Sequence, residues 1–200
     1  MVTMMNYSAG MVSQVFAFVE TKKLAELFAK GFSKEEAWDK VESENLFQLR
    51  NATRLRRTFN YVCTRLEALP VELIKLLPIL DTETAKAVVL ISIMKTDLLF
   101  FEFVYEVYRG KIILGERTIE NRDVNAFFDE KASQSDIVSS WSESGIQKLK
   151  NCYLKNLADS GLIESTKTRE IKPALVNYRV EELLGKYDMG TYLNAVKGVR

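Results

Sequence analysis

The stretch Gln134–Val176, QSDIVSSWSESGIQKLKNCYLKNLADSGLIESTKTREIKPALV, decides the fold of the C-terminal part of the chain. Its pattern predicts a short helix at Ser135–Trp141, a tight turn at Ser142–Gly145 and a longer helix at Ile146–Ser160. Leu162–Val176 then predicts a two-stranded ribbon with a polar, basic tip. This order of helix, turn, helix and β-wing is typical of a winged helix-turn-helix.

The longer helix has one apolar and one polar face, and Gly161 is predicted to end it. Ser144 and Gln147 fit a capping box at its start. Apolar residues recur at helical spacing on one arc: Ile146, Leu149, Tyr153 and Leu157. The opposite arc carries hydroxyl, amide and ammonium groups with almost no acid among them: Ser144, Gln147, Lys148, Asn151 and Lys155.

These polar groups are of the kinds that contact DNA. Gln and Asn amides can pair with base edges in the major groove, and Lys can bind phosphate. The wing adds three cations, Lys167, Arg169 and Lys172. We therefore predict that this arc and the wing bind DNA. The alternative is an ordinary amphipathic helix with a solvated polar face before a hairpin.

The composition limits the possible functions. The chain has 200 residues, 47% hydrophobic and 28% charged, which is typical of a folded globular protein. Its net charge is +1, so any nucleic-acid binding must come from local patches. It has no histidine, which excludes His-based acid–base chemistry and His-ligated metal sites. Cys63 and Cys152 are isolated and predict neither a disulfide nor a zinc site. No signal peptide is visible.

The first seventy residues predict helices. One is expected from a cap at Asn6 or Ser8 to about Lys30. Ser33–Glu36 forms a capping box for a short helix through Val41. A long helix is expected from about Leu46 to Leu69, ended by Pro70.

The long helix carries five arginines and no acid between Glu44 and Glu67. Four arginines follow helical spacing and predict a second basic surface: Arg50, Arg54, Arg57 and Arg65. A block of one sign indicates a partner surface, and Arg suits phosphate through its planar fork. The alternatives are a solvated face or ion pairs with a neighbouring helix.

Residues 85–108 are the most apolar part of the chain. A membrane span needs about 20 apolar residues with few charges. This window carries five charged side chains: Lys86, Lys95, Asp97, Glu102 and Glu106. We therefore predict two buried helices, capped at Asp81 or Thr82 and divided at Lys95–Asp97, rather than a membrane segment.

The best domain boundary lies near residue 115. Gly110 is expected to end the apolar helix, and Ile112–Leu114 to form a strand or extended link. Asp123 is expected to cap a helix at Val124–Lys131. Two short helices are expected to close the chain, at Glu181–Tyr187 and Thr191–Lys197.

Catalytic motifs are weak. Gly110–Gly115 has the glycine spacing of a phosphate-binding loop, but Glu116 stands where the lysine is required. Asp159 with Glu170 and Lys172 imitates a nuclease pattern, on the predicted wing. We predict that the protein is not an enzyme and holds no cofactor or metal. A metal-dependent nuclease and a protein-interaction scaffold are the alternatives.

A set of short segments, spread in order over nearly the whole length, carries a family resemblance: Glu44–Gln48, Arg65-Leu66, Lys95–Asp97 before LLFFEFVYEV, Phe127–Lys131, Trp141-Ser142 and Leu157–Ile163. With these segments the chain resembles the BrxA family, small accessory proteins of BREX phage-defence systems that were formerly described as inner-membrane proteins. The resemblance implies a cytoplasmic protein with a NusB-like helical bundle and a C-terminal winged helix. It also implies double-stranded DNA binding without catalysis, in the service of host–phage discrimination.

Together these observations predict a mainly α protein in two domains. Residues 1–115 are expected to form a helical bundle domain, NusB-like by the resemblance. Residues 116–200 are expected to form a winged-helix domain with a small β-wing and closing C-terminal helices. Double-stranded DNA is the expected partner, with other BREX proteins as further candidates and no membrane.

Overall fold

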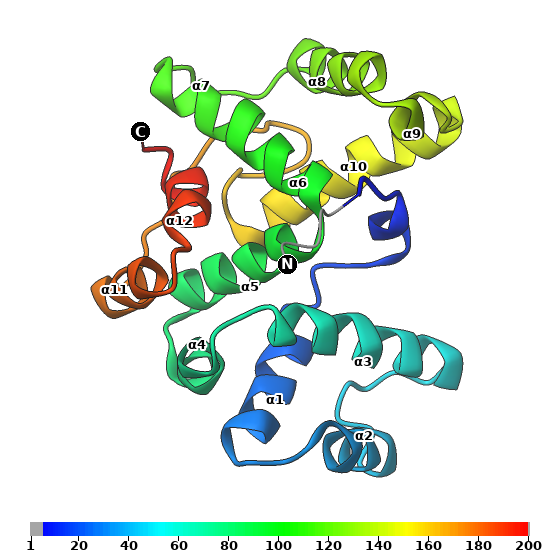
Figure 1. Cartoon of the computed structure of the whole chain (residues 1–200), viewed down its shortest axis with the longest axis vertical. Coiled ribbons are helices and arrows are strands. Elements are labelled where there is room, and N and C mark those ends of the chain that lie inside the picture. Colours follow the sequence, from blue (N-terminus) through cyan, green and yellow to red (C-terminus); the bar gives the residue numbers. More distant parts are fainter. Residues whose placement is uncertain (1–5, 200) are drawn as a thin grey trace.

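The structure is a computed structural model that describes residues 6–199 and is built almost entirely of helices (Figure 1). The first part contains η1 (Gly10–Ser13), α1 (Phe18–Ala29), α2 (Lys34–Ser43), α3 (Ala52–Glu67), α4 (Val71–Leu76) and η2 (Leu77–Ile79). The centre contains α5 (Thr82–Thr96), α6 (Leu98–Glu102), the π-helical turn η3 (Phe103–Tyr108) and α7 (Arg109–Ile113). The last part contains α8 (Asn121–Gln134), α9 (Asp136–Ser139), α10 (Glu143–Ser160), α11 (Tyr178–Lys186) and α12 (Gly190–Lys197).

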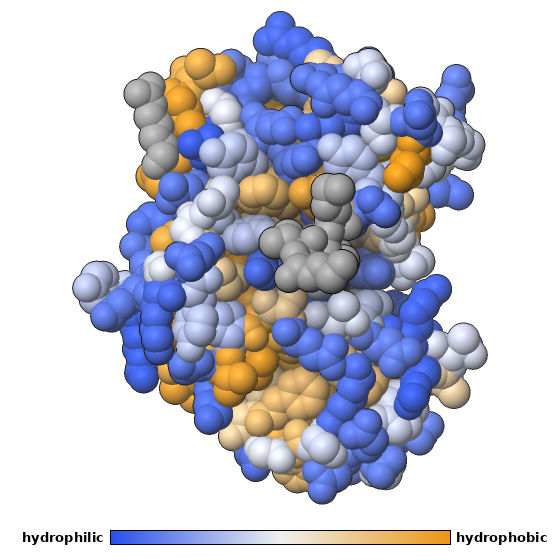
Figure 2. All heavy atoms as spheres, in the orientation of Figure 1, coloured by the Kyte–Doolittle hydropathy of each residue, from blue (hydrophilic) through white to orange (hydrophobic). Residues whose placement is uncertain are grey.

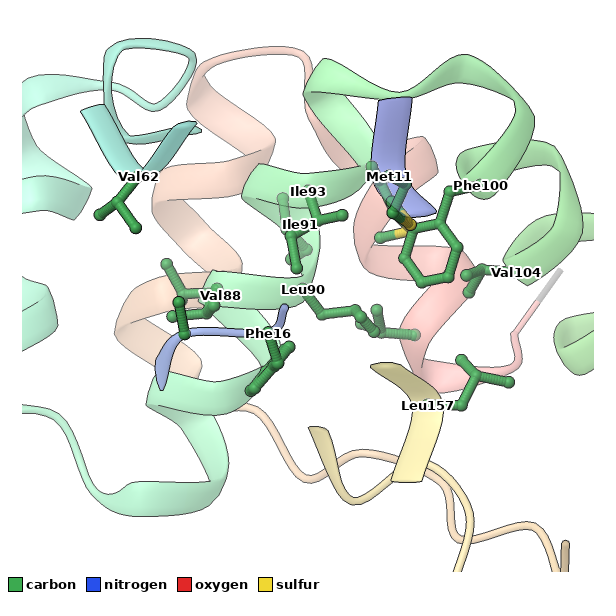
Figure 3. Packing of buried hydrophobic residues seen from close by; sticks show 14 of the residues in the cluster. Met11, Phe16, Val62, Val88, Leu90, Ile91, Ile93, Phe100, Val104 and Leu157 are labelled. Carbon is green, nitrogen blue, oxygen red and sulfur yellow. The ribbon is translucent and has the colours of Figure 1, made fainter. Parts of the chain in front are cut away.

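Helix α5 is the centre of the molecule and is apolar on every side. It packs against α1, α3, α6, α10 and α12, so it has no face left for solvent over most of its length. Figure 3 shows Met11, Leu90, Phe100 and Leu157 meeting in this interior from four separate elements. Asp97 ends α5 and caps α6 by accepting a hydrogen bond from the Phe100 N–H at 2.9 Å. The predicted division into two buried helices is confirmed. Among residues 6–199, no helix is long and apolar enough to cross a membrane.

The prediction that the apolar helix ends at Gly110 and is followed by a strand is wrong. The segments α6, η3 and α7 follow one another without a break, and the chain turns only at Gly115, which has a φ of +72°. Tertiary contacts explain the difference, because α7 packs against α12 and this packing outweighs the β-propensity of the two isoleucines. Lys111 is buried, with only 8% of its surface exposed. It pairs with Glu116 at 2.5 Å and with Asp123 at 2.8 Å, and these ion pairs fix the turn.

The predicted helix from Asn6 or Ser8 to Lys30 is also interrupted. Residues 14–17 leave the helical conformation between η1 and α1, and Ala17 has a φ of +54°. The guanidinium of Arg65 donates to the carbonyl oxygens of Val15 at 2.8 Å and Phe16 at 3.3 Å. A continuous helix would have used these two oxygens for its own hydrogen bonds. The segment Gly10–Val19 is called the strap below.

Helix α3 begins at Ala52, six residues later than predicted from Leu46. Asn51 caps it by accepting from the Arg54 N–H at 2.8 Å, while Asn45 accepts from the Leu49 N–H at 3.0 Å. These short side chains compete with helical hydrogen bonds before the helix starts. Two other predicted caps are confirmed: the Ser33–Glu36 capping box of α2 and Asp81 at the start of α5.

The helices of the C-terminal part lie near their predicted places, with different starts. Helix α8 begins at Asn121, and Asp123 completes a capping box with Glu120 instead of capping the helix itself. Helix α10 begins at Glu143, because Ser142 accepts the Gly145 N–H at 3.2 Å. The predicted turn before this helix is thus its first turn, and the predicted Ser144 cap is wrong. Gly161 ends α10 in the left-handed conformation, as predicted.

The expected two-stranded wing is not confirmed. In the part of the chain that the structure describes no strand forms, and two isolated antiparallel bridges join Ile163 to Ile171 and Thr118 to Glu170. The Lys172 N–H still donates to the Leu162 carbonyl at 2.8 Å, and beyond Lys172 the chain pairs with α12 instead of continuing a ribbon. The Ala174 N–H reaches the carbonyl of Val196 in α12 at 3.4 Å, and Pro173 has no N–H for pairing.

The two-domain division remains a prediction. Buried aromatic rings join the two expected parts directly. The rings of Phe100 and Tyr153 lie 5.0 Å apart, and those of Phe103 and Phe127 lie 5.3 Å apart. Any hinge between residues 115 and 116 would have to separate these rings.

Candidate nucleic-acid interface

The structure places the five nominated polar residues of α10 together on one exposed face. Leu149, Tyr153 and Leu157 are fully buried on the other side of the helix. The exposed residues lie three or four positions apart, so their side chains share one arc. They are Ser144, Gln147, Lys148, Asn151 and Lys155, and we call them the α10 polar face. The chain has no acidic residue from Ser144 to Lys155.

Interactions within this face are weak enough to be exchanged for a ligand. The Gln147 amide donates to Asn151 Oδ1 at 3.3 Å. Lys155 Nζ lies 3.1 Å from Asp159, one turn along the helix. Both of these side chains are partly solvated, and such surface pairs contribute only about 0.3–0.5 kcal/mol. Lys148 makes no ion pair with any described residue. Lys148 and Lys155 are therefore available to phosphate oxygens.

The buried side of α10 holds the helix firmly in place. The Tyr153 ring packs against the rings of Phe100, Phe103 and Phe128. Cys152 Sγ lies 3.2 Å from the carbonyl oxygen of Met11 in the strap. Burial raises the pKa of the Cys152 thiol to about 11, so it stays protonated and serves as a weak donor. The α10 polar face is thus presented by a fixed helix.

The three wing cations differ in their surroundings. Lys167 is exposed at the tip of a turn, where Ser165 Oγ accepts its backbone N–H at 3.2 Å. Lys172 is exposed and lies 3.7 Å from Glu164. Arg169 has a φ of +53° and is folded back, donating to Asn121 Oδ1 at 2.6 Å. Lys167 therefore points outward at the tip, whereas Arg169 ties the turn to the start of α8.

The predicted arginine row of α3 is divided between surface and core. Arg54 and Arg57 of α3 are exposed, as is Arg50, which precedes the Asn51 cap and therefore lies outside the helix in which it was predicted. Their side chains form no ion pair with the described residues, and we call these three the α3 arginine row. Arg65 is only 1% exposed and is a structural donor to the strap, so its inclusion in a basic surface was wrong. Helical spacing places Arg65 on the same side as the others but cannot show that the strap covers it.

Two further cations were missed from the sequence. Arg56 is exposed and stacks over the Trp38 ring at 4.2 Å. Lys86 of α5 lines a hollow of about 530 Å³ together with Lys155 and strap residues from Val15 to Val19. The sequence indicates Lys86 only as a charge that argues against a membrane span, because its place in an otherwise apolar helix does not predict a position beside Lys155.

The nuclease-like pattern is not assembled by the fold. Asp159 pairs with Lys155, whereas Lys172 pairs with Glu164. Over the described residues, no three Asp, Glu or Cys side chains are grouped so that they could hold a metal ion.

Comparison with known proteins gives the family. The BrxA family model matches residues 5–188. A BREX protein BrxA of Bacillus cereus is 38% identical over 193 residues, 96% of each chain. A BREX protein BrxA of Paramagnetospirillum magneticum is 21% identical over 89% of each chain. The crystal structure of an uncharacterized protein from Magnetospirillum magneticum has the same fold, with a TM-score of 0.81 at 20% identity over 96% of this chain and 98% of that one. The chain therefore belongs to the BrxA family of BREX proteins.

Proposed function

We propose that this protein binds double-stranded DNA without catalysis, as an accessory component of a BREX phage-resistance system in the cytoplasm. The observation that carries the proposal is the α10 polar face, a fixed and exposed set of amide, hydroxyl and ammonium groups free of acids from Ser144 to Lys155. The order of α8, α9, α10 and a basic turn supports docking in the manner of a winged helix.

Each group on this surface has a chemical role in the proposed complex. Gln147 and Asn151 can form paired hydrogen bonds with the edge of an adenine in the major groove. Lys148 and Lys155 lie on the same face and can neutralise backbone phosphates beside that groove. Lys167, Lys172 and, if released from Asn121, Arg169 would extend the phosphate contacts along the neighbouring strand.

The proposal is tested by titrating the protein into labelled duplex DNA at several salt concentrations. Phosphate contacts release counterions, so log K should fall linearly with log salt at about 0.9 per contact. Magnesium should produce no cleavage in the same samples. Absence of binding at low salt, or binding that does not depend on salt, would contradict the proposal.

A protein-interaction scaffold is the second candidate, and exposed apolar side chains favour it. Leu175, just before α11, and Tyr178, the first residue of α11, are 74% and 77% exposed. Side chains of this kind often mark a protein contact. Co-purification with another BREX protein that is lost in a Leu175→Ser, Tyr178→Ser variant, while duplex DNA is not bound, would favour this function.

A further inference from the structure

The α10 polar face and the α3 arginine row are far apart in the sequence but flank the same segment of chain. Figure 1 shows η1, the first turn of the strap, between α10 and α3, and both helices begin on the same side of the molecule. The outline of the surface is indented between them on that side (Figure 2).

The arginine row lies on the side of α3 that faces the strap. Arg54, Arg57, Tyr61 and Arg65 follow one another at intervals of three or four residues, so they occupy one side of the helix. At the inner end of this side, Arg65 Nη1 donates to the Val15 carbonyl and Nη2 donates to Gln14 Oε1 at 3.0 Å. Arg57 and Arg54 continue the same side outward, beyond the part that the strap covers.

The other side of the strap touches α10 next to its polar face. Cys152 Sγ lies 3.2 Å from the Met11 carbonyl oxygen. Asn156 is only 2% exposed, and its Nδ2 lies 4.0 Å from Met11 Sδ. Lys155 and the strap residue Val15 line the same hollow. The strap thus has α10 and Lys155 on one side and the arginine side of α3 on the other.

The charges in this region are unbalanced in favour of cations. Arg50, Arg54, Arg57 and Lys148 have no ion-pair partner among residues 6–199. The hollow beside the strap adds no net charge, because Lys86 and Lys155 share its lining with Glu20 and Asp159. Packed elements lie about 8–10 Å apart, so two helices separated by the strap lie roughly 16–20 Å apart. That distance corresponds to about five base pairs at 3.4 Å each.

We propose that a single DNA duplex is contacted at the same time by the α10 polar face and by the α3 arginine row, with the strap between them. This inference rests on the proposed function. It gives the protein a longer footprint on the DNA than α10 alone would give. Arg54 and Arg57 bind phosphates about half a helical turn from the groove that α10 occupies. Arg65 contacts no DNA and positions the strap that joins the two surfaces.

The test combines charge variants with DNA of two lengths, a short hairpin duplex of about 5 base pairs and a long duplex of about 20 base pairs, or roughly 17 and 68 Å. The short duplex is no longer than the separation of the two surfaces, so it cannot fill the α10 groove and reach the α3 arginine row at once. Arg54→Gln with Arg57→Gln should weaken binding of the long duplex about tenfold or more, since each loses a charged hydrogen bond. It should make the salt slope shallower by about two units. Binding of the short duplex should change less than about twofold. Circular dichroism should show an intact fold, because both side chains are exposed.

Arg179→Gln is the matched control, since Arg179 is an exposed arginine of α11 whose side chain forms no described ion pair. It should leave both affinities unchanged. If Lys148→Gln with Lys155→Gln weakens binding while the α3 variant acts like the control, the joint surface is wrong and the proposed function stands. If the protein binds two short duplexes independently, the surfaces are separate and the inference is again wrong. If neither pair of variants affects binding, the joint surface is wrong and the α10 polar face is not the DNA site either.

Discussion

A guanidinium group can act as an exposed phosphate ligand or as a buried hydrogen-bond donor, and its surroundings decide between the two. Arg57 and Arg65 lie about two turns apart on the same side of α3. Arg57 is exposed, whereas Arg65 is enclosed by the strap and donates to three of its oxygen atoms. The spacing of the row could be predicted from the sequence. The burial of Arg65 could not, because it depends on a segment fifty residues away that breaks its own helix.

Arg65→Met should destabilise the fold by about 3 kcal/mol, because the carbonyl oxygens of Val15 and Phe16 lose their donors inside the protein. Urea unfolding measures the change. Arg57→Met is the control and should shift the stability by less than about 0.5 kcal/mol. A stable Arg65→Met variant that no longer binds DNA would instead assign Arg65 to the interface.

Asp97 should make the stability depend on pH. Burial raises the pKa of this carboxyl to about 6, more than the nearby Arg65 charge lowers it. Between the unfolded pKa near 4 and the folded value, the native state binds more protons than the unfolded state. The free energy of unfolding should therefore fall as pH rises from about 4 to about 6, by about 1–2 kcal/mol since the group is partly solvated.

Asp97→Asn is the informative comparison, because Asn keeps an oxygen that can accept the Phe100 N–H of the cap. Its stability should lack this fall between pH 4 and pH 6. Parallel pH profiles for parent and variant would show that Asp97 keeps an ordinary pKa in the folded protein.

At the scale of elements, capping and periodicity predicted much of the fold. The buried nature of α5, the capping box of α2 and the Gly161 end of α10 follow from local chemistry and are confirmed. The errors arose where distant contacts override local preference. Packing against α12 keeps Ile112 and Ile113 helical, and the chain after Lys172 pairs with α12 through the Ala174 N–H instead of extending a ribbon.

The start of α10 provides a sharp test of this kind, because two serines two residues apart have different roles. Ser142 caps the helix through the Gly145 N–H, whereas Ser144 lies exposed within the first turn. Ser142→Ala should cost about 1 kcal/mol in thermal or urea unfolding, and Ser144→Ala should cost much less. The reverse order would restore Ser144 as the cap and shorten α10.

At the scale of the whole molecule, a net charge of +1 gives no general attraction to DNA, so the proposed affinity for DNA would have to come from where the cations lie. The sequence predicted both basic segments, but it could not show that the strap brings them to one side. Ion pairs also reduce the charge that some of these cations can offer to phosphate. Lys155 is partly neutralised by Asp159 and Lys172 by Glu164, whereas Lys148 and Lys167 have no such partner among the described residues.

The dependence of DNA affinity on salt should report this arrangement for the α10 polar face. If Lys148, Lys155, Lys167 and Arg169 each contact a phosphate, these four contacts contribute about −3 to −4 to the slope of log K against log salt. Lys155→Ala should make the slope shallower by about one unit and weaken all duplex sequences alike. Asn151→Ala, one turn away on the same face, removes no charge and is the matched control. It should keep the slope and alter only the preference among sequences.

The folded-back position of Arg169 makes Lys167→Ala the more sensitive test of the turn. If every one of these variants binds as the parent does, the α10 polar face is not the DNA site, and the α3 arginine row or a protein partner takes its place.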